Sequence, residues 1–302
     1  MNPIHFILIC KNNLISRFKG ASIDLCRTNY LSMNFAQIIA TINSDYDNPQ
    51  AVFRELVRNV LNNKVRADEL DYSLDEADLA LIRGQIERFN QGEPLQYITG
   101  KAYFYRYEFE VNEDTLIPRP ETEELVDMVI EENRQKSGLR ILEIGTGSGC
   151  IPISLFLNLE GASITSLDIS AKAIEVAQRN ADILNAHIDF VVFDFLDASR
   201  WGELGEFDLI VSNPPYIPMS RSHDMEEHVK SYEPSIALFV EDDDAFLFYK
   251  KTLDFARTHL KQGGMVYFET SQYEQLEQYD GFILSSLKDM SGNLRFLKAG
   301  LG

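Results

Sequence analysis

The chain has 302 residues, of which 45% are hydrophobic, and a formal net charge of -19. This length is enough for a large core and about two domains. The negative charge argues against direct binding to nucleic acid, since affinity for phosphates comes largely from Lys and Arg. The three cysteines form neither a Cys-x-x-Cys pair nor a disulfide framework, which is typical of a reducing, cytoplasmic protein.

The first 32 residues differ from the rest of the chain, because they are basic and hold two of the three cysteines. The apolar run at residues 4–10 is too short to span a bilayer, and no small-residue cleavage site follows it. Neither a signal peptide nor a membrane anchor is therefore expected. We predict an atypical, disordered leader at residues 1–32, with an extra N-terminal strand or helix as the alternative.

Residues 33–92 predict a small helical domain. Their first apolar residues share a helical face: Phe35, Ile38, Ile39 and Ile42. Asn48-Pro49 predicts one helix start, and Ser73-Leu-Asp-Glu76 predicts a capping box at another. Gly92 and Pro94 end the helical pattern.

Residues 93–118 predict a linker that contains a β-hairpin, because residues 97–111 are aromatic and β-prone. The linker runs into Ile117-Pro-Arg-Pro-Glu-Thr-Glu123, where Pro120 suits the first turn of a helix. Arg119 lies between two prolines, which restricts its backbone. This restriction suits a cation that is positioned near a ligand carboxylate.

Residues 119–302 alternate between strand and helix patterns, which predicts an α/β domain with a mostly parallel sheet covered on both faces. Strands are expected at residues 140–144, 163–168, 188–194, 208–212 and 265–270, with helices from residue 150, at 171–184 and at 245–260. A final hairpin is expected at residues 282–287 and 294–297. An antiparallel end on a parallel sheet is typical of Rossmann-like class I methyltransferases.

A glycine-rich turn follows the first strand of this domain. Gly145, Gly147 and Gly149 are spaced as Gly-x-Gly-x-Gly, and Cys150 stands where a dinucleotide fingerprint has its third glycine. S-adenosylmethionine has no phosphate, so this turn suits its amino-acid part. Asp168 ends the next strand, about 20 residues on, where a carboxylate can accept hydrogen bonds from ribose hydroxyls.

Asn213-Pro214-Pro215-Tyr216 follows a later hydrophobic strand. The Asn213 side-chain oxygen and the Pro214 carbonyl can accept two hydrogen bonds, and the prolines fix φ and lack N–H groups. The Tyr216 ring can pack on a flat group. Together with the glycine turn, these residues predict methyl transfer from S-adenosylmethionine to a planar amide or amine nitrogen.

Five segments resemble one known family: Gly92-Glu-Pro-Leu-Gln-Tyr-Ile-Thr-Gly100, Thr115-Leu-Ile-Pro-Arg-Pro-Glu-Thr-Glu123, Glu143 to Gly149, Asn213-Pro-Pro-Tyr-Ile217 and Tyr232-Glu-Pro234. The chain is similar over about residues 92–302 to the protein-(glutamine-N5) methyltransferases of peptide chain release factors, the PrmC or HemK group. The resemblance implies methylation of the glutamine in the Gly-Gly-Gln motif of class 1 release factors, with S-adenosylmethionine as the cofactor.

The resemblance also implies roles for single residues. Gly145, Thr146, Gly147, Ser148 and Gly149 would contact the methionine part of the cofactor, Asp168 its ribose and Phe195 its adenine. Relatives often carry tryptophan where this chain has Phe195. Asn213 would lie beside the methyl group, and Asn213, Pro214, Pro215 and Tyr216 would hold the target glutamine. Arg119 is the further candidate for substrate binding.

Two alternatives remain open from the sequence. Asn-Pro-Pro-Tyr equally suits an adenine amine, so an adenine-N6 methyltransferase of DNA or RNA is the second candidate. A binding module that keeps the cofactor fold without catalysis is the third.

His223 and His228 are five residues apart and do not share one helical face, so no metal site is expected.

Overall fold

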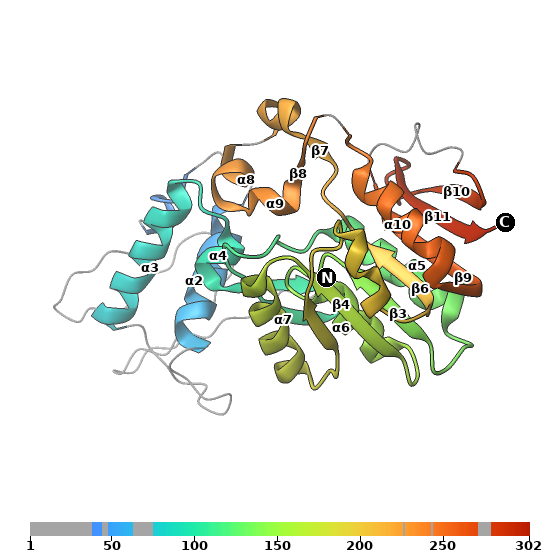
Figure 1. The fold of residues 1–302 in the computed structure, drawn as a ribbon. Helices are drawn as coiled ribbons and strands as arrows, with labels where there is room; N and C mark the ends of the chain where they lie inside the picture. The colour runs from blue at the N-terminus through green and yellow to red at the C-terminus, as the bar shows by residue number, and fades with distance from the viewer. Residues whose placement is uncertain (1–37, 44–47, 63–74, 226, 243, 271–278) are drawn as a thin grey trace. The chain divides into compact units, whose positions relative to one another are not determined.

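The structure, a computed structural model, describes residues 38–43, 48–62, 75–225, 227–242, 244–270 and 279–302 (Figure 1). The leader predicted at residues 1–32 lies outside the described residues. The chain divides into two compact units, with the division between Thr99 and Gly100. The domain boundaries that we placed after residues 32, 92 and 118 stay predictions.

The first unit is helical in its described part, with α2 (Pro49–Asn62), α3 (Glu76–Asn90) and α4 (Leu95–Thr99). Leu56, Ile82 and Phe89 belong to its buried core. The capping box predicted at residues 73–76 is wrong. Asp75 caps α3 instead: its carboxylate accepts the Asp78 N–H at 2.8 Å, and the Asp78 carboxylate accepts the Asp75 N–H at 3.2 Å. An aspartate serves as well as serine in this role.

The second unit opens with the predicted hairpin, formed by β1 (Lys101–Phe104) and β2 (Tyr107–Glu110) in antiparallel register. Tyr105 and Arg106 make its two-residue turn, and both have positive φ, at 44° and 79°. Two successive residues with positive φ suit the twist of a tight hairpin. The hairpin prediction is confirmed, although residues 97–99, which we included in it, are helical.

A seven-stranded sheet forms the body of the second unit. Its strands are β3 (Arg140–Ile144), β4 (Ser163–Asp168), β5 (Asp189–Val192), β6 (Phe207–Ser212), β9 (Leu260–Glu269), β10 (Phe282–Lys288) and β11 (Leu294–Leu301). They are ordered β10-β11-β9-β6-β3-β4-β5. β11 is antiparallel to both of its neighbours, and the other pairs are parallel. The predicted Rossmann-like sheet with an antiparallel end is confirmed.

Helices cover both faces of this sheet. α5 (Pro120–Asn133), α6 (Cys150–Asn158) and α7 (Ala171–Leu184) pack in one apolar cluster, and α10 (Leu247–His259) packs in the other (Figure 1). Successive residues of β3 therefore belong to different clusters: Ile141 lies in the first cluster and Leu142 in the second. None of the helices in the described ranges has the length and apolar character needed to cross a membrane.

Shorter elements connect β5, β6 and α10. They are η1 (Ala198–Glu203), β7 (Ile217–Pro218), η2 (Met219–Asp224), α8 (Glu227–Tyr232), α9 (Ser235–Leu238) and β8 (Phe239–Val240). β7 and β8 pair in parallel. This pairing holds the segment after Asn213-Pro-Pro-Tyr216 to a second segment of the chain.

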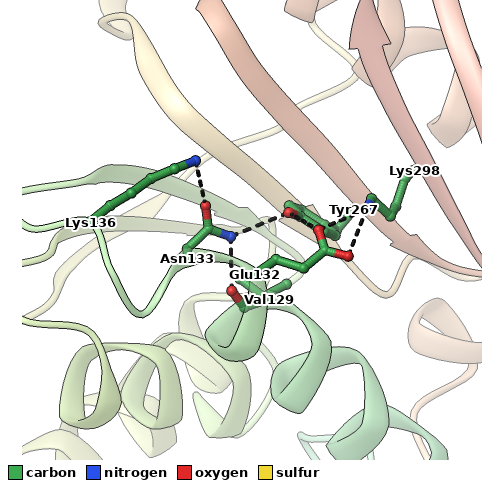
Figure 2. A network of polar contacts seen from close by, with 6 residues as sticks. All are labelled: Val129, Glu132, Asn133, Lys136, Tyr267 and Lys298. Carbon is green, nitrogen blue, oxygen red and sulfur yellow. Dashed lines mark hydrogen bonds and ion pairs between the residues drawn. The ribbon is translucent and has the colours of Figure 1, made fainter.

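A polar network fixes the last turn of α5 to the sheet (Figure 2). The Asn133 Nδ2 donates to the Tyr267 hydroxyl at 3.2 Å, and that hydroxyl donates to Glu132 Oε2 at 2.8 Å. Lys298, on β11, donates to both Glu132 oxygens at 2.7 Å. α5 is therefore held against two strands at the end opposite to its N-terminal turn.

Candidate active site

The predicted glycine turn, Asp168 and the Asn-Pro-Pro-Tyr turn lie at the carboxyl ends of three neighbouring strands. β3 lies between β4 and β6, and all three run parallel. The glycine turn follows β3, Asp168 ends β4, and Asn213 follows β6. Because β4 extends the sheet to one side of β3 and β6 to the other, this edge is the point where the chain order reverses. Open α/β sheets bind their ligands at such a point.

The three glycines of the turn have left-handed backbone conformations, with φ of 96° at Gly145, 51° at Gly147 and 80° at Gly149. A Cβ at Gly149 would lie 3.0 Å from both Ala177 Cβ and Ile153 Cδ1. A Cβ at Gly147 would meet nothing within 4 Å. Gly149 therefore allows α6 and α7 to pack closely, whereas Gly147 presents bare backbone to open space.

We expect alanine at these two glycines to have different effects. Gly149→Ala combines left-handed strain with overpacking and should lower the free energy of unfolding by about 2 to 4 kcal/mol. Gly147→Ala should cost only about 1 kcal/mol, from the backbone alone, and should mainly weaken binding of S-adenosylhomocysteine. Denaturant unfolding and calorimetric titration test both variants. Equal stability losses would contradict the assignment of Gly149 to packing.

Glu143, near the end of β3, precedes the glycine turn and is fully buried. Ser166 Oγ donates to its Oε2 at 2.7 Å, while its Oε1 is buried without a hydrogen-bond partner among the described residues. Burial raises the pKa of the Glu143 carboxyl to about 8, against the opposing effect of the Ser166 hydrogen bond. The Glu143 carboxyl is therefore mostly in its neutral form at pH 7 and is held in the core by its hydrogen bond with Ser166.

The raised pKa of Glu143 predicts a pH-dependent stability for the ligand-free protein. Because this pKa is about 8 in the fold and ordinarily 4.5, the folded chain binds more protons in this window, and stability falls as pH rises through it. Glu143→Gln has no proton to lose. As pH rises, the free energy of unfolding of the wild type should therefore fall relative to that of the variant, by on the order of a few kcal/mol. If the free energies of unfolding of the wild type and the variant, measured with denaturant, changed in parallel from pH 5 to 8, this effect would be absent.

Asp168 accepts hydrogen bonds from backbone N–H groups through both oxygens. The Gly147 N–H donates to Oδ2 at 2.9 Å, and the Ser170 N–H donates to Oδ1 at 2.8 Å. Burial raises the pKa of Asp168, and these two bonds act in the opposite direction. Asp168 therefore ties the glycine turn to the end of β4. Ile169, which follows it, is a large apolar residue with 51% exposure, and sequence reasoning did not single it out.

Asn213 lies beside the glycine turn, since a Cβ built at Gly145 would lie 3.8 Å from the Asn213 backbone oxygen. Ser212 Oγ donates to the Ile144 carbonyl at 2.7 Å and so joins the ends of β6 and β3. The Asn213 Nδ2 donates to Thr122 Oγ1 at 3.1 Å. Thr122 has no role in the sequence prediction, because 91 residues separate it from Asn213.

The rest of the Asn-Pro-Pro-Tyr turn is half-buried. Pro214 is buried, whereas Pro215 and Tyr216 are partly exposed. Tyr216 packs against the apolar cluster that includes Phe246 and Tyr249. Burial raises the pKa of the Tyr216 hydroxyl, with a further contribution from the charge of Glu269. The turn thus carries a neutral Tyr216 side chain close in sequence to the two expected acceptors, the Asn213 side-chain oxygen and the Pro214 carbonyl.

Arg119 is the N-cap residue of α5 and forms an ion pair with Glu233, at 2.6 Å between Nη2 and Oε1. The Glu233 side chain is only 1% exposed, and its other oxygen accepts the Ile117 N–H at 3.1 Å. The sequence prediction did not identify Glu233 as the partner of Arg119, although Glu233 lies in Tyr232-Glu-Pro234, one of the segments that carried the resemblance. The pair joins the Ile-Pro-Arg-Pro-Glu-Thr-Glu segment to the chain that follows the Asn-Pro-Pro-Tyr turn.

Phe195 lies in an aromatic group with Trp201 and Phe255. Its ring is 4% exposed and stacks on Trp201 with 5.6 Å between the ring centroids. Trp201 Nε1 also donates to the Phe195 carbonyl at 2.8 Å. The structure thus places this ring in the core near the end of β5, and its contact with adenine stays a prediction.

Asn180 on α7 is a further residue that sequence reasoning missed. Its buried side chain accepts the Glu110 N–H at 2.6 Å and donates to the Ser148 carbonyl at 2.8 Å. Asn180 therefore joins the β1–β2 hairpin to the glycine turn. An asparagine on the buried face of a predicted helix is the only sequence signal for this role.

The chain is similar to known methyltransferases. The family model described as Methyltransferase small domain matches residues 122–229. A release factor glutamine methyltransferase from Flavobacterium psychrophilum is 43% identical over 237 residues, with 76% of this chain and 82% of the relative covered. One from Bacteroides thetaiotaomicron is 42% identical, with 71% and 78% covered.

A solved protein-(glutamine-N5) methyltransferase (release factor-specific) from Alicyclobacillus acidocaldarius is 27% identical, with 63% of this chain and 98% of that chain covered and a TM-score of 0.39. The relatives establish that the chain is an enzyme and that S-adenosylmethionine is its cofactor. With the fold, the glycine turn and the Asn-Pro-Pro-Tyr turn in place, this protein belongs to the release factor glutamine methyltransferase family.

Proposed function

We propose that this enzyme transfers a methyl group from S-adenosylmethionine to the side-chain amide nitrogen of the glutamine in the Gly-Gly-Gln motif of class 1 release factors. The observation that carries the proposal is the position of the Asn213-Pro-Pro-Tyr216 turn. It follows β6 and lies next to the glycine turn after β3. A nitrogen held by this turn would therefore lie close to a cofactor bound at the glycine turn.

The chemistry requires orientation more than a strong base. An amide nitrogen is a poor nucleophile because its lone pair is delocalised. The Asn213 Oδ1 and the Pro214 carbonyl oxygen would accept its two N–H groups and aim the lone pair, and proline keeps the second acceptor in place beforehand. Bound S-adenosylmethionine supplies an electrophilic methyl group. The amide nitrogen would take the methyl group and lose one proton to solvent, and S-adenosylhomocysteine would be the product released.

We assign some of the predicted site residues to the cofactor and others to the substrate. We assign the methionine part to the turn that holds Thr146 and Ser148, the ribose to Asp168 and the adenine side to Phe195. Support for this comes from the open backbone at Gly147, where a Cβ would meet nothing within 4 Å.

We assign Pro215 and Tyr216 to the glutamine side of the site. Arg119 keeps 33% of its side chain exposed although it is paired with Glu233, so it can contact the substrate while it holds the chain that follows the Asn-Pro-Pro-Tyr turn.

The substrate class places the enzyme among the proteins of translation. We therefore expect it to act in the cytoplasm, on a protein partner, without binding nucleic acid or a membrane directly. The adenine-N6 alternative uses the same two acceptors, but the named relatives are release factor enzymes, which favours glutamine.

A direct assay separates these functions. The enzyme is incubated with labelled S-adenosylmethionine and a class 1 release factor, its Gly-Gly-Gln→Gly-Gly-Ala variant, or nucleic acid. We expect label on the wild-type factor only, with one added methyl group located on the glutamine by mass spectrometry. Label on adenine would support the alternative, and label on the variant factor would contradict the assigned acceptor.

A further inference from the structure

Two successive hydrogen bonds connect the Asn-Pro-Pro-Tyr turn to two segments that are distant in the sequence. Thr122 Oγ1 donates to Glu269 Oε2 at 2.6 Å, and Asn213 Nδ2 donates to Thr122 Oγ1 at 3.1 Å. We propose that Thr122 and Glu269 are positioning residues, which orient the Asn213 amide so that its oxygen faces the substrate nitrogen. This inference rests on the proposed function and extends it to residues outside the turn.

The direction of these two hydrogen bonds follows from the number of protons available. A threonine hydroxyl has one proton, and Thr122 gives its proton to the Glu269 carboxylate. Only the lone pairs of Thr122 Oγ1 remain for Asn213. An amide oxygen in that position would face another acceptor, so the Nδ2 end must point toward Thr122, and Oδ1 must point the other way.

Burial makes this arrangement costly to reverse. Thr122 and Glu269 are each 3% exposed, so water has little access to either side chain. Burial raises the pKa of the Glu269 carboxyl to about 7, and the Thr122 hydrogen bond acts in the opposite direction by stabilising the ionised form. The accepting carboxylate that this arrangement needs therefore prevails above that pH. A hydrogen bond to a charged group is worth about 1.5 to 3 kcal/mol, roughly twice a neutral one.

The backbone that carries Thr122 is also held in place. Thr122 lies in the first turn of α5, and Glu269 is the last residue of β9. Two residues earlier on β9, and therefore on the same side of the strand, Tyr267 bonds to Glu132 and Asn133 in the last turns of α5 (Figure 2). α5 is thus tied to one strand at both ends.

The orientation of Asn213 decides whether its side chain helps the reaction. With Oδ1 toward the substrate, it accepts an N–H of the glutamine amide and helps to aim the lone pair. With Nδ2 toward the substrate, two donors would face each other and the acceptor would be lost. Misplacement of a reacting group by about 1 Å already costs as much as 10²-fold in rate.

The test removes the Thr122 hydroxyl and keeps its shape. Thr122→Val should lower kcat for release factor methylation by about 10- to 100-fold. Its KM for S-adenosylmethionine and its affinity for S-adenosylhomocysteine should stay unchanged. Thr122→Ser, which retains the hydroxyl, should restore most of the lost turnover. Thr252→Val is the matched control, because it removes another buried hydroxyl, one that donates to the Phe248 carbonyl within α10.

Thermal unfolding of each variant establishes that the assay temperature lies within the folded range. Equal kcat for the wild type and Thr122→Val would overturn the inference. So would a Thr122→Ser variant as impaired as Thr122→Val, since the methyl group and not the hydroxyl would then matter. A wild-type enzyme that leaves the release factor glutamine unmodified would instead overturn the proposed function, and this inference with it.

Discussion

Asn213→Ala is expected to lower kcat by about 10²- to 10³-fold, a loss comparable to that of one preorganised polar group at a reacting centre. The variant removes the Oδ1 acceptor and leaves the backbone turn between its prolines. It also leaves the glycine turn, Glu143 and Asp168 untouched. Cofactor binding should therefore remain nearly intact while turnover is lost.

Two measurements on the same preparation test this expectation. Calorimetric titration with S-adenosylhomocysteine reports cofactor affinity, and labelled methyl transfer to a release factor reports turnover. Unchanged turnover would remove Asn213 from the catalytic group. A parallel loss of cofactor affinity would show that Asn213 mainly shapes the cofactor site.

Asp168→Ala is expected to act on cofactor affinity instead. The carboxylate would accept hydrogen bonds from the ribose, and it also accepts the N–H groups of Gly147 and Ser170. Loss of charge-assisted hydrogen bonds of about 1.5 to 3 kcal/mol corresponds to a roughly 10- to 150-fold weaker affinity for S-adenosylhomocysteine. Asp168→Asn keeps one oxygen acceptor and should lie between the wild type and the alanine variant.

A matched control comes from the neighbouring strand. Asp189 is an exposed carboxylate at the start of β5, at the opposite edge of the sheet from the site. Asp189→Ala should leave cofactor affinity unchanged. If Asp168→Ala also bound S-adenosylhomocysteine as the wild type does, Asp168 would have no part in ribose binding.

The sequence predicted the sheet domain closely because its signals are local. Three predicted elements coincide with β3, β4 and α7, since apolar runs with short polar breaks mark buried parallel strands and their helices. Ends without a strong cap or breaker were less certain. The strand predicted to begin at Met265 begins at Leu260, because pairing with Phe207 extends β9 across Gly263 and Gly264.

Side-chain partners across the fold could not be read from the sequence. Arg119 and Glu233 are 114 residues apart, and Thr122 and Glu269 are 147 residues apart. Thr122 also has a sufficient local explanation, because it lies in the first turn of a helix, and Arg119 was predicted to face a ligand carboxylate and not Glu233. Only the packing of α5 on β9 shows that Thr122 connects a buried carboxylate to the Asn-Pro-Pro-Tyr turn.

The most direct test of the account is a crystal structure of the enzyme with S-adenosylhomocysteine and a peptide that contains Gly-Gly-Gln. We expect the Asn213 Oδ1 and the Pro214 carbonyl oxygen to lie within about 3.2 Å of the glutamine amide nitrogen. That nitrogen should face the cofactor sulfur. A glutamine bound away from this turn, or a cofactor bound away from the glycine turn between Gly145 and Gly149, would contradict the account.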